Sequence, residues 1–198
     1  MKIKKLLYVS AFIMLGVMLV DSACALPTGT DALDITLKRV RRKEHAKGQD
    51  YDDQRQTISF TIKVENKNAF EDTPKVKLQV KFIGEVMNDR IRDRSLFKIL
   101  RTDKLKIKPI DGGEDFVQEL ADLELVFDES NYARKGDRYF CYAARIISTK
   151  GEVIYEKTDK PTLIKDFDRL WEIKDQAYFD KDLYGVPGVD EFIAKNKR

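Results

Sequence analysis

Residues 58–64 read Ile-Ser-Phe-Thr-Ile-Lys-Val, and residues 76–82 read Val-Lys-Leu-Gln-Val-Lys-Phe. In both stretches an apolar side chain stands at every second position. Successive side chains of a β-strand point to opposite faces, whereas a helix repeats its apolar face at every third or fourth residue. Both stretches are therefore predicted to be strands with one buried and one solvated face.

Further short apolar segments, separated by turn residues, lie on both sides of these two. They cover residues 33–37, 96–100, 105–107, 120–127, 139–147 and 153–155. Short strands at this spacing are typical of a β-sandwich, so the predicted fold is an all-β, immunoglobulin-like antiparallel sandwich of seven to eight strands. The continuous apolar run at 139–147 indicates a central strand. Residues 116–123 fit a helical turn as well as a strand.

Two local features interrupt this pattern. Residues 41–57 are almost wholly polar and predict a long exposed loop after the first strand. Gly84 follows an alternating run and predicts a β-bulge.

The last forty residues have a different character. After Pro161, apolar residues recur at helical spacing, and Thr158 or Asp159 is the expected helix cap. The chain thus divides into a sandwich domain at 26–158 and a mixed, partly helical extension at 159–198. Apolar residues at helical spacing usually cover a sheet, so we expect this extension to pack on the sandwich.

The alternative for the extension is a free docking arm. In that case its aromatic side chains would be the binding residues of the protein: Trp171, Tyr178, Phe179 and Tyr184. Aromatic side chains that are exposed next to charged residues are common at protein interfaces.

Residues 1–25 have the pattern of a secretory signal peptide. Three lysines at positions 2, 4 and 5 precede an uncharged segment at 6–20, and Ala23 and Ala25 fit the small-residue cleavage rule. We expect cleavage after Ala25 and a location in the periplasm, on the outer surface or outside the cell. An uncleaved anchor and a lipidated Cys24 are the alternatives, but Asp21 departs from the lipoprotein pattern.

Composition excludes several classes of protein. The 198 residues carry a net charge of +3, which argues against a dedicated nucleic-acid binder. One histidine and two cysteines exclude a His-rich metal site, a zinc ribbon and a disulfide framework. Without Cys24 the chain keeps a single cysteine, Cys141, which its apolar neighbours predict to be buried and reduced.

The sequence contains no recognisable catalytic or metal-binding motif. His45 is the single histidine and lies in a charged stretch, with no nucleophile turn of the Gly-x-Ser-x-Gly type in the chain. Asp50, Asp52 and Asp53 lack the spacing of an EF-hand loop. The expectation is therefore a protein that is not an enzyme and needs no cofactor. The basic run at 38–43 could bind an anionic polymer or lipid headgroups, although a solvated strand end is the simpler interpretation.

Residues 139–141, Tyr-Phe-Cys, resemble the penultimate strand of immunoglobulin-type domains, where a Tyr stands two residues before a Cys. The partner cysteine is missing from residues 58–64, and Trp171 follows the predicted sandwich instead of lying on its third strand. With its signal peptide, its immunoglobulin-like domain, the turn at 64–68, the Lys-rich strand after it and the turn at 108–113, the chain resembles the pilus-associated, immunoglobulin-like exported proteins of verrucomicrobial bacteria over most of residues 33–158. That resemblance implies a role in pilus assembly or surface attachment, without enzymatic activity.

These observations lead to one functional expectation. The protein is predicted to be an exported, non-catalytic binding or assembly module, with a protein partner in the cell envelope or pilus. A homo-oligomer is compatible with the sequence, whereas nucleic acid and a membrane span in the mature chain are not expected. A lipid-anchored envelope protein and a periplasmic carbohydrate-processing enzyme remain the alternatives.

Overall fold

The fold was examined in a computed structural model, which describes residues 32–45, 53–87, 95–129, 134–189 and 191–192. The predicted signal peptide and Cys24 lie outside these residues, as do Asp50 and Asp52. The side chains of His45 and Asp53 also lie outside the description, although their backbones belong to strands.

Strands dominate the described part of the chain. Eight strands and one short helix follow one another as β1 (Leu33–His45), β2 (Asp53–Asn66), β3 (Val76–Val86), β4 (Leu96–Ile107), β5 (Asp115–Glu129), β6 (Arg134–Ser148), β7 (Val153–Thr158), α1 (Phe167–Glu172) and β8 (Tyr178–Asp180). Every pair of neighbouring strands is antiparallel. The predicted all-β antiparallel sandwich is confirmed.

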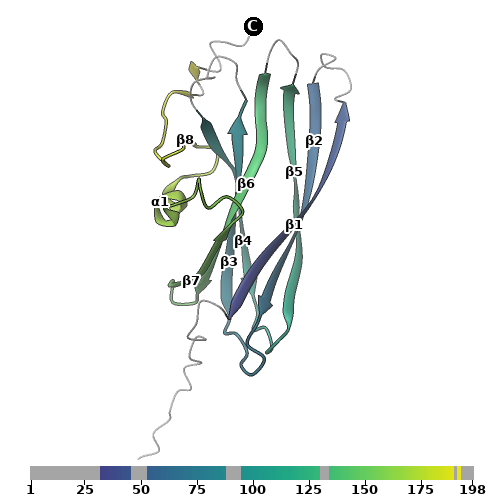
Figure 1. The fold of residues 1–198 in the computed structure, drawn as a ribbon, viewed down its shortest axis with the longest axis vertical. Helices are drawn as coiled ribbons and strands as arrows, with labels where there is room; N and C mark the ends of the chain where they lie inside the picture. The colour runs from purple at the N-terminus through teal and green to yellow at the C-terminus, as the bar shows by residue number, and fades with distance from the viewer. Residues whose placement is uncertain (1–31, 46–52, 88–94, 130–133, 190, 193–198) are drawn as a thin grey trace, which may run out of the picture.

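The strands form two layers, which separate clearly in Figure 1. Sheet A has the order β1-β2-β5, and sheet B has the order β7-β6-β3-β4-β8. Strand β6 joins the layers, because its first residues pair with the end of β5 before the strand continues into sheet B beside β3. Immunoglobulin-type sheets have the orders A-B-E-D and G-F-C. Here only the first residues of β6 follow β5 in sheet A, and β4 extends sheet B instead, so the immunoglobulin-like classification stays a prediction.

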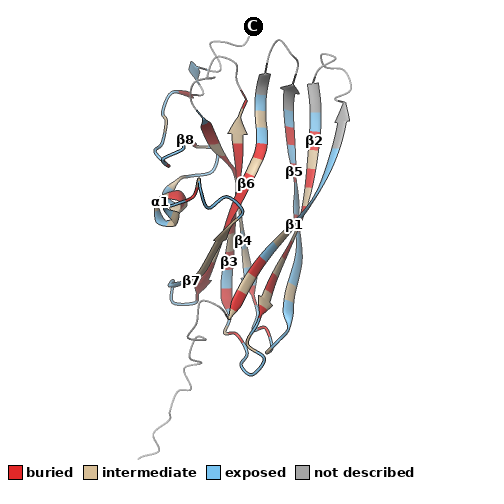
Figure 2. Ribbon diagram, viewed as in Figure 1, coloured by how far each residue is buried: buried red, intermediate tan, exposed pale blue. Residues whose placement is uncertain are grey.

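The inner faces of the two sheets form the core, visible as red bands in Figure 2. On β2, Ile58, Phe60, Ile62 and Val64 are at most 1% exposed, as the alternation predicted. The rings of Phe60 and Phe82 meet across the two sheets with their centroids 4.4 Å apart. The sandwich is therefore held together by apolar side chains from two strands that the sequence pattern identified.

The predicted loop at 41–57 was wrong in its bounds. The structure extends β1 to His45 and begins β2 at Asp53, with His45 paired to Gln54. At residues 41–42 the side chains of β1 are exposed, so the strand has no alternation of buried and exposed residues to reveal it.

Strand β5 decides between the two alternatives that the sequence left open for residues 116–123. Residues 116–123 belong to one strand from Asp115 to Glu129 and do not form a helical turn. The spacing of Leu120 and Leu123 arises because the register with β2 shifts there, so that Ala121 and Asp122 lie opposite one residue of β2. Gly84 marks another register shift, between β3 and β6, as predicted.

The helix begins later than the sequence indicated. Asp166 is its N-cap and accepts a hydrogen bond from the backbone N–H of Arg169 at 3.0 Å. Thr158 and Asp159 instead bind β6: the Thr158 hydroxyl donates to the Tyr142 carbonyl, and Asp159 accepts from the Tyr142 N–H. Both residues expected as helix caps therefore hydrogen-bond the end of β7 to β6.

Truncating Phe60 tests the core. Phe60→Ala removes a ring that is 1% exposed, so we expect the free energy of unfolding to fall by about 3–5 kcal/mol in urea melts. Phe70→Ala is the matched control, because that ring is 96% exposed and its loss should change stability by less than about 0.5 kcal/mol. Equal effects of the two substitutions would contradict the assignment of the buried face.

Candidate functional site

The C-terminal segment lies on the outer face of sheet B. We call residues 159–189 the cover. Its apolar residues Ile164, Leu170, Phe179 and Leu183 are at most 4% exposed. They pack on a patch of the sheet formed by Ile83, Phe97, Ile99, Cys141 and Ala143. The cover therefore closes one half of an apolar sheet face, and β8 extends the sheet beside β4.

A buried lysine fixes the cover to the sheet. Lys81, on β3, is 4% exposed and donates to the carbonyl oxygens of Leu170, Trp171 and Ile173 at the end of α1. A cation at this position also interacts favourably with the negative end of the helix. Burial lowers the pKa of the Lys81 ammonium group to about 8.

Cys141 lies beneath the cover. Its thiol is free and fully buried, and burial raises its pKa far above the usual range. Cys141 and Ala143 are small, which leaves room for Leu170 and Phe179 above them. The predicted burial of Cys141 agrees with this position.

The four aromatic residues proposed as a binding site have different environments. Tyr178 and Phe179 belong to β8 and are at most 9% exposed, but they lie in different apolar clusters, Phe179 beneath the cover and Tyr178 with Leu96 and Val189. Trp171 is half-buried, with the Arg145 guanidinium 4.2 Å from the centre of its ring. Tyr184 is 57% exposed and carries the Arg169 guanidinium on its ring at 4.4 Å. The structure does not bring the four rings together on one surface, and their binding role stays a prediction.

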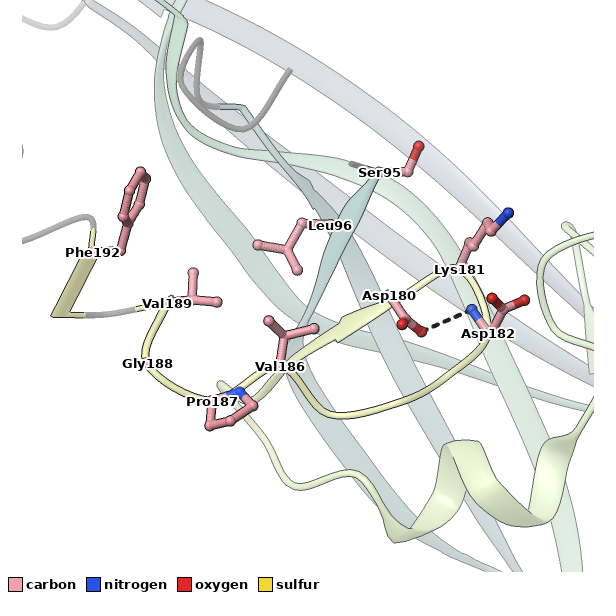
Figure 3. Close-up of a pocket in the computed structure, with 10 residues that line it drawn as sticks. All are labelled: Ser95, Leu96, Asp180, Lys181, Asp182, Val186, Pro187, Gly188, Val189 and Phe192. Atoms are coloured by element: carbon pink, nitrogen blue, oxygen red, sulfur yellow. Dashed lines mark hydrogen bonds between the residues drawn. The ribbon is translucent and has the colours of Figure 1, made fainter. Parts of the chain in front are cut away.

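A groove of about 710 Å³ lies where the end of the cover meets the start of β4 (Figure 3). Its apolar side is formed by Leu96, Val186, Val189 and Phe192. On its polar side Asp180 accepts a hydrogen bond from the Asp182 N–H at 2.9 Å. This groove is formed largely by the C-terminal segment, and its charged lining residues are Asp180, Lys181 and Asp182.

The open edge of sheet A is strongly basic. Strand β1 pairs with β2 on one side, and no other described strand pairs with it on the other. Residues 35–42 contain no acidic side chain and four exposed cations: Lys38, Arg39, Arg41 and Arg42. Asp34 fastens the start of this strand to β7, because its carboxylate accepts from Lys157 at 2.6 Å and from Tyr155 at 3.1 Å. These partners lower the pKa of Asp34 to about 2.

The opposite edge of sheet A is acidic. From Asp115 to Val126, β5 pairs with β2 alone among the described strands, and this stretch contains no basic residue. Its exposed carboxylates are Asp115, Glu119, Asp122 and Glu124. Arg101, from β4, donates to the carbonyls of Ala121 and Asp122 at the bulge and so occupies the middle of this edge.

The register places these charges in rows across sheet A. Lys38 lies opposite Thr61, which lies opposite Glu119. Four residues along β1, Arg42 lies opposite Thr57, which lies opposite Glu124. Each row therefore runs from a cation through a hydroxyl group to a carboxylate. These four charged side chains form no ion pair with another residue that the structure describes.

The sequence analysis identified the basic run but not its acidic counterpart. The sequence signal for the acidic edge is four carboxylates, with no cation, between residues 115 and 126. That both runs occupy opposite edges of one sheet depends on strand order, which no local pattern reveals. The described residues contain no helix long and apolar enough to cross a bilayer, and no group of His, Cys, Asp and Glu that could hold a metal ion.

Comparison with known proteins gives no family. No protein-family model matches the chain, and no curated protein matches it significantly. Among solved structures, a protein of Akkermansia muciniphila aligns with 82% of this chain and 90% of its own, at 13% identity and a TM-score of 0.33. A β-glucosidase of Kluyveromyces marxianus aligns with 63% of this chain and 13% of its own, at 15% identity and a TM-score of 0.26. At these TM-scores neither likeness carries an argument.

Replacing Lys81 tests the attachment of the cover. Lys81→Met leaves the carbonyls at the end of α1 without their buried donor, so we expect a loss of about 1–3 kcal/mol of stability and a red shift of Trp171 fluorescence. Lys77→Met is the control on the same strand and face, because Lys77 is exposed. An unchanged stability and emission for Lys81→Met would show that the cover does not depend on this lysine.

Proposed function

We propose that the protein is an exported, non-catalytic assembly module whose copies join edge to edge through sheet A. In this arrangement β1 of one copy lies beside β5 of the next. The observation that supports the proposal is the opposite charge of the two open edges of one sheet, with four cations on residues 38–42 and four carboxylates on residues 115–124.

The charges favour unlike edges as neighbours. Two β1 edges would place Lys38, Arg41 and Arg42 against their own copies, and two β5 edges would oppose carboxylates. Like charges directly opposite each other on neighbouring strands are destabilising, whereas opposite charges stabilise. A β1–β5 contact is heterologous, so it can be repeated from copy to copy and produce a ring or a filament.

The strand directions are compatible with such a row. Strands β1 and β5 are both antiparallel to β2, so they run in the same direction. A copy displaced sideways within the sheet by three strand spacings, each about 4.8 Å, places Lys38 beside Glu119 and Arg42 beside Glu124 of its neighbour. Sheet B has more strands than sheet A, so displacement alone would make the B sheets of neighbouring copies overlap. Each copy must therefore also rotate about the contact, and the row curves with sheet A on its inner side.

Affinity and direction have different sources in this proposal. Exposed ion pairs contribute about 0–1 kcal/mol each, so the charged rows mainly select the register and the partner edge. Main-chain hydrogen bonds between neighbouring edges supply the affinity, as in other cases of strand addition. The β-bulge lies at Ala121 and Asp122, and the carbonyl groups of these two residues already accept hydrogen bonds from Arg101. The main-chain pairing with the neighbouring copy therefore forms on either side of these two residues.

The setting of this assembly is the cell envelope or a pilus. Export is inferred from the pattern of residues 1–25. The pilus is inferred from the resemblance of that signal peptide, together with the turns at 64–68 and 108–113 and the Lys-rich strand between them, to pilus-associated proteins. The absence of catalysis is inferred from the single His45 and the lack of a nucleophile motif. The sandwich supplies the rigid support that edge-to-edge assembly requires.

Charge reversal tests the assembly. The wild-type mature chain is expected to self-associate with rising concentration in sedimentation velocity, while K38E/R42E and E119K/E124K remain monomeric, since in each variant positions 38 and 42 carry the same charge as positions 119 and 124 that they would meet. An equimolar mixture of the two variants restores the association, because every contact again joins unlike edges. The control K150E/K165E reverses two exposed charges away from both edges and should assemble like the wild type.

Two results would contradict the proposal. A wild-type chain that stays monomeric at all accessible concentrations removes the assembly itself. If either variant alone still assembles, or the mixture fails to do so while both variants are folded by circular dichroism, the contact does not run from β1 to β5.

A further inference from the structure

The outer face of sheet B carries a ladder of lysines beyond the cover. Toward the start of β3 and the end of β4, Lys77 lies directly opposite Lys106, and Gln79 lies opposite Lys104. All three lysines are exposed and point away from the core, because their strand neighbours Leu78, Leu105 and Ile107 belong to it. This half of the sheet face is therefore solvated and basic, whereas the other half is apolar and covered.

The ladder is electrostatically unsatisfied. Like charges directly opposite each other on neighbouring strands destabilise a sheet. None of these three lysines forms an ion pair with any residue in the described ranges. An anion that lies along the two strands would remove the repulsion between Lys77 and Lys106.

The ladder leads into a cleft. Where it meets the cover, a cleft of about 600 Å³ is lined by Lys104 and also by Lys81, Arg145 and Lys174. Thr102 and Gln79 add neutral polar groups to its wall. Two carboxylates also line it, Glu172 and Asp175, so the cations outnumber the anions by four to two.

Two of the cleft's polar groups are held in position. The Arg145 guanidinium stacks on Trp171 at 4.2 Å, and its Nε donates to the Gln79 side-chain oxygen at 2.9 Å. Asp175 accepts from the Thr102 N–H at 3.2 Å and from the Thr102 hydroxyl. Asp175 is therefore engaged by the protein. Arg145 lies opposite Glu156 on β7, and its terminal N–H groups are donors additional to the Nε that binds Gln79. A preorganised cation next to exposed lysines is suited to a ligand that carries several negative charges.

We propose that this surface binds a linear anionic polysaccharide, with one charged sugar in the cleft and the following acidic groups on Lys104, Lys106 and Lys77. Carboxylate and sulfate groups of sugars are recognised by the same cations, and hydroxyl groups of the ring suit Thr102 and Gln79. A cleft that continues into a row of lysines fits a chain better than a flat membrane. The described ladder also lacks an exposed aromatic ring on which a nucleic-acid base could stack.

This site is separate from the proposed assembly contact. It lies on the outer face of sheet B, whereas the charged edges belong to sheet A. The charge-reversal variants of sheet A should therefore keep their affinity for polysaccharide. Conversely, substitutions in sheet B that abolish polysaccharide binding should leave self-association unchanged.

The test uses the full mature chain and three polysaccharides. Heparin supplies sulfate and carboxylate groups, polygalacturonate supplies carboxylate groups alone, and dextran is the neutral control. We expect calorimetry to show binding to at least one of the two polyanions, weakened by added salt, and none to dextran. The triple variant K77Q/K104Q/K106Q should lose roughly tenfold or more in affinity. The control K150Q/K165Q/K181Q removes the same charge from exposed positions outside the ladder, the cleft and both edges of sheet A, and should change affinity less than about threefold.

Replacing a residue of the cleft gives a second test of the proposal. Arg145→Gln should weaken binding of the polyanion without removing any lysine of the ladder. The proposal is overturned if neither polyanion binds, if both triple variants lose affinity equally, or if Arg145→Gln has no effect in a folded protein. Vesicles of equal parts phosphatidylglycerol and phosphatidylcholine complete the test. If the protein binds these vesicles more tightly than either polysaccharide, and K77Q/K104Q/K106Q abolishes that binding, the surface is assigned to lipid headgroups instead.

Discussion

The contact between Phe60 on β2 and Phe82 on β3 joins the two sheets, and the other features of the molecule depend on it. Cys141 is a free thiol, so the described part of the chain has no disulfide to hold the layers together. Packing across the sandwich must supply the stability that a cross-link would otherwise add. With the inner faces committed to this core, the outer faces and the sheet edges remain available for other contacts.

The outer face of sheet B shows how one strand can serve two purposes. Ile83 lies in the apolar half of β3 beneath the cover, and Lys77 lies in the basic half. Lys81 stands between them and is buried by its hydrogen bonds to the end of α1. The position of this lysine sets the boundary of the cover, and with it the wall of the cleft that adjoins the lysine ladder.

Local pattern was sufficient for the core and insufficient for the edges. Alternation identified β2 and β3, because each has one face in the core, and it missed the ends of β1 and β2, where the described side chains of β1 are exposed. The cap at Asp166 and the three-residue strand β8 depend on the docking of the cover, so helical spacing alone could not place them. The rows from Lys38 to Glu119 and from Arg42 to Glu124 require the order β1-β2-β5, which is a property of the whole chain.

Backbone amide hydrogen exchange, compared between dilute and concentrated protein, tests the central claim of edge-to-edge assembly most directly. The account predicts that residues 36–42 of β1 and residues 115–126 of β5 gain protection together as the concentration rises, while the cover at 159–189 is unchanged. Protection gained by one edge without the other would contradict a β1–β5 contact, as would protection confined to the cover.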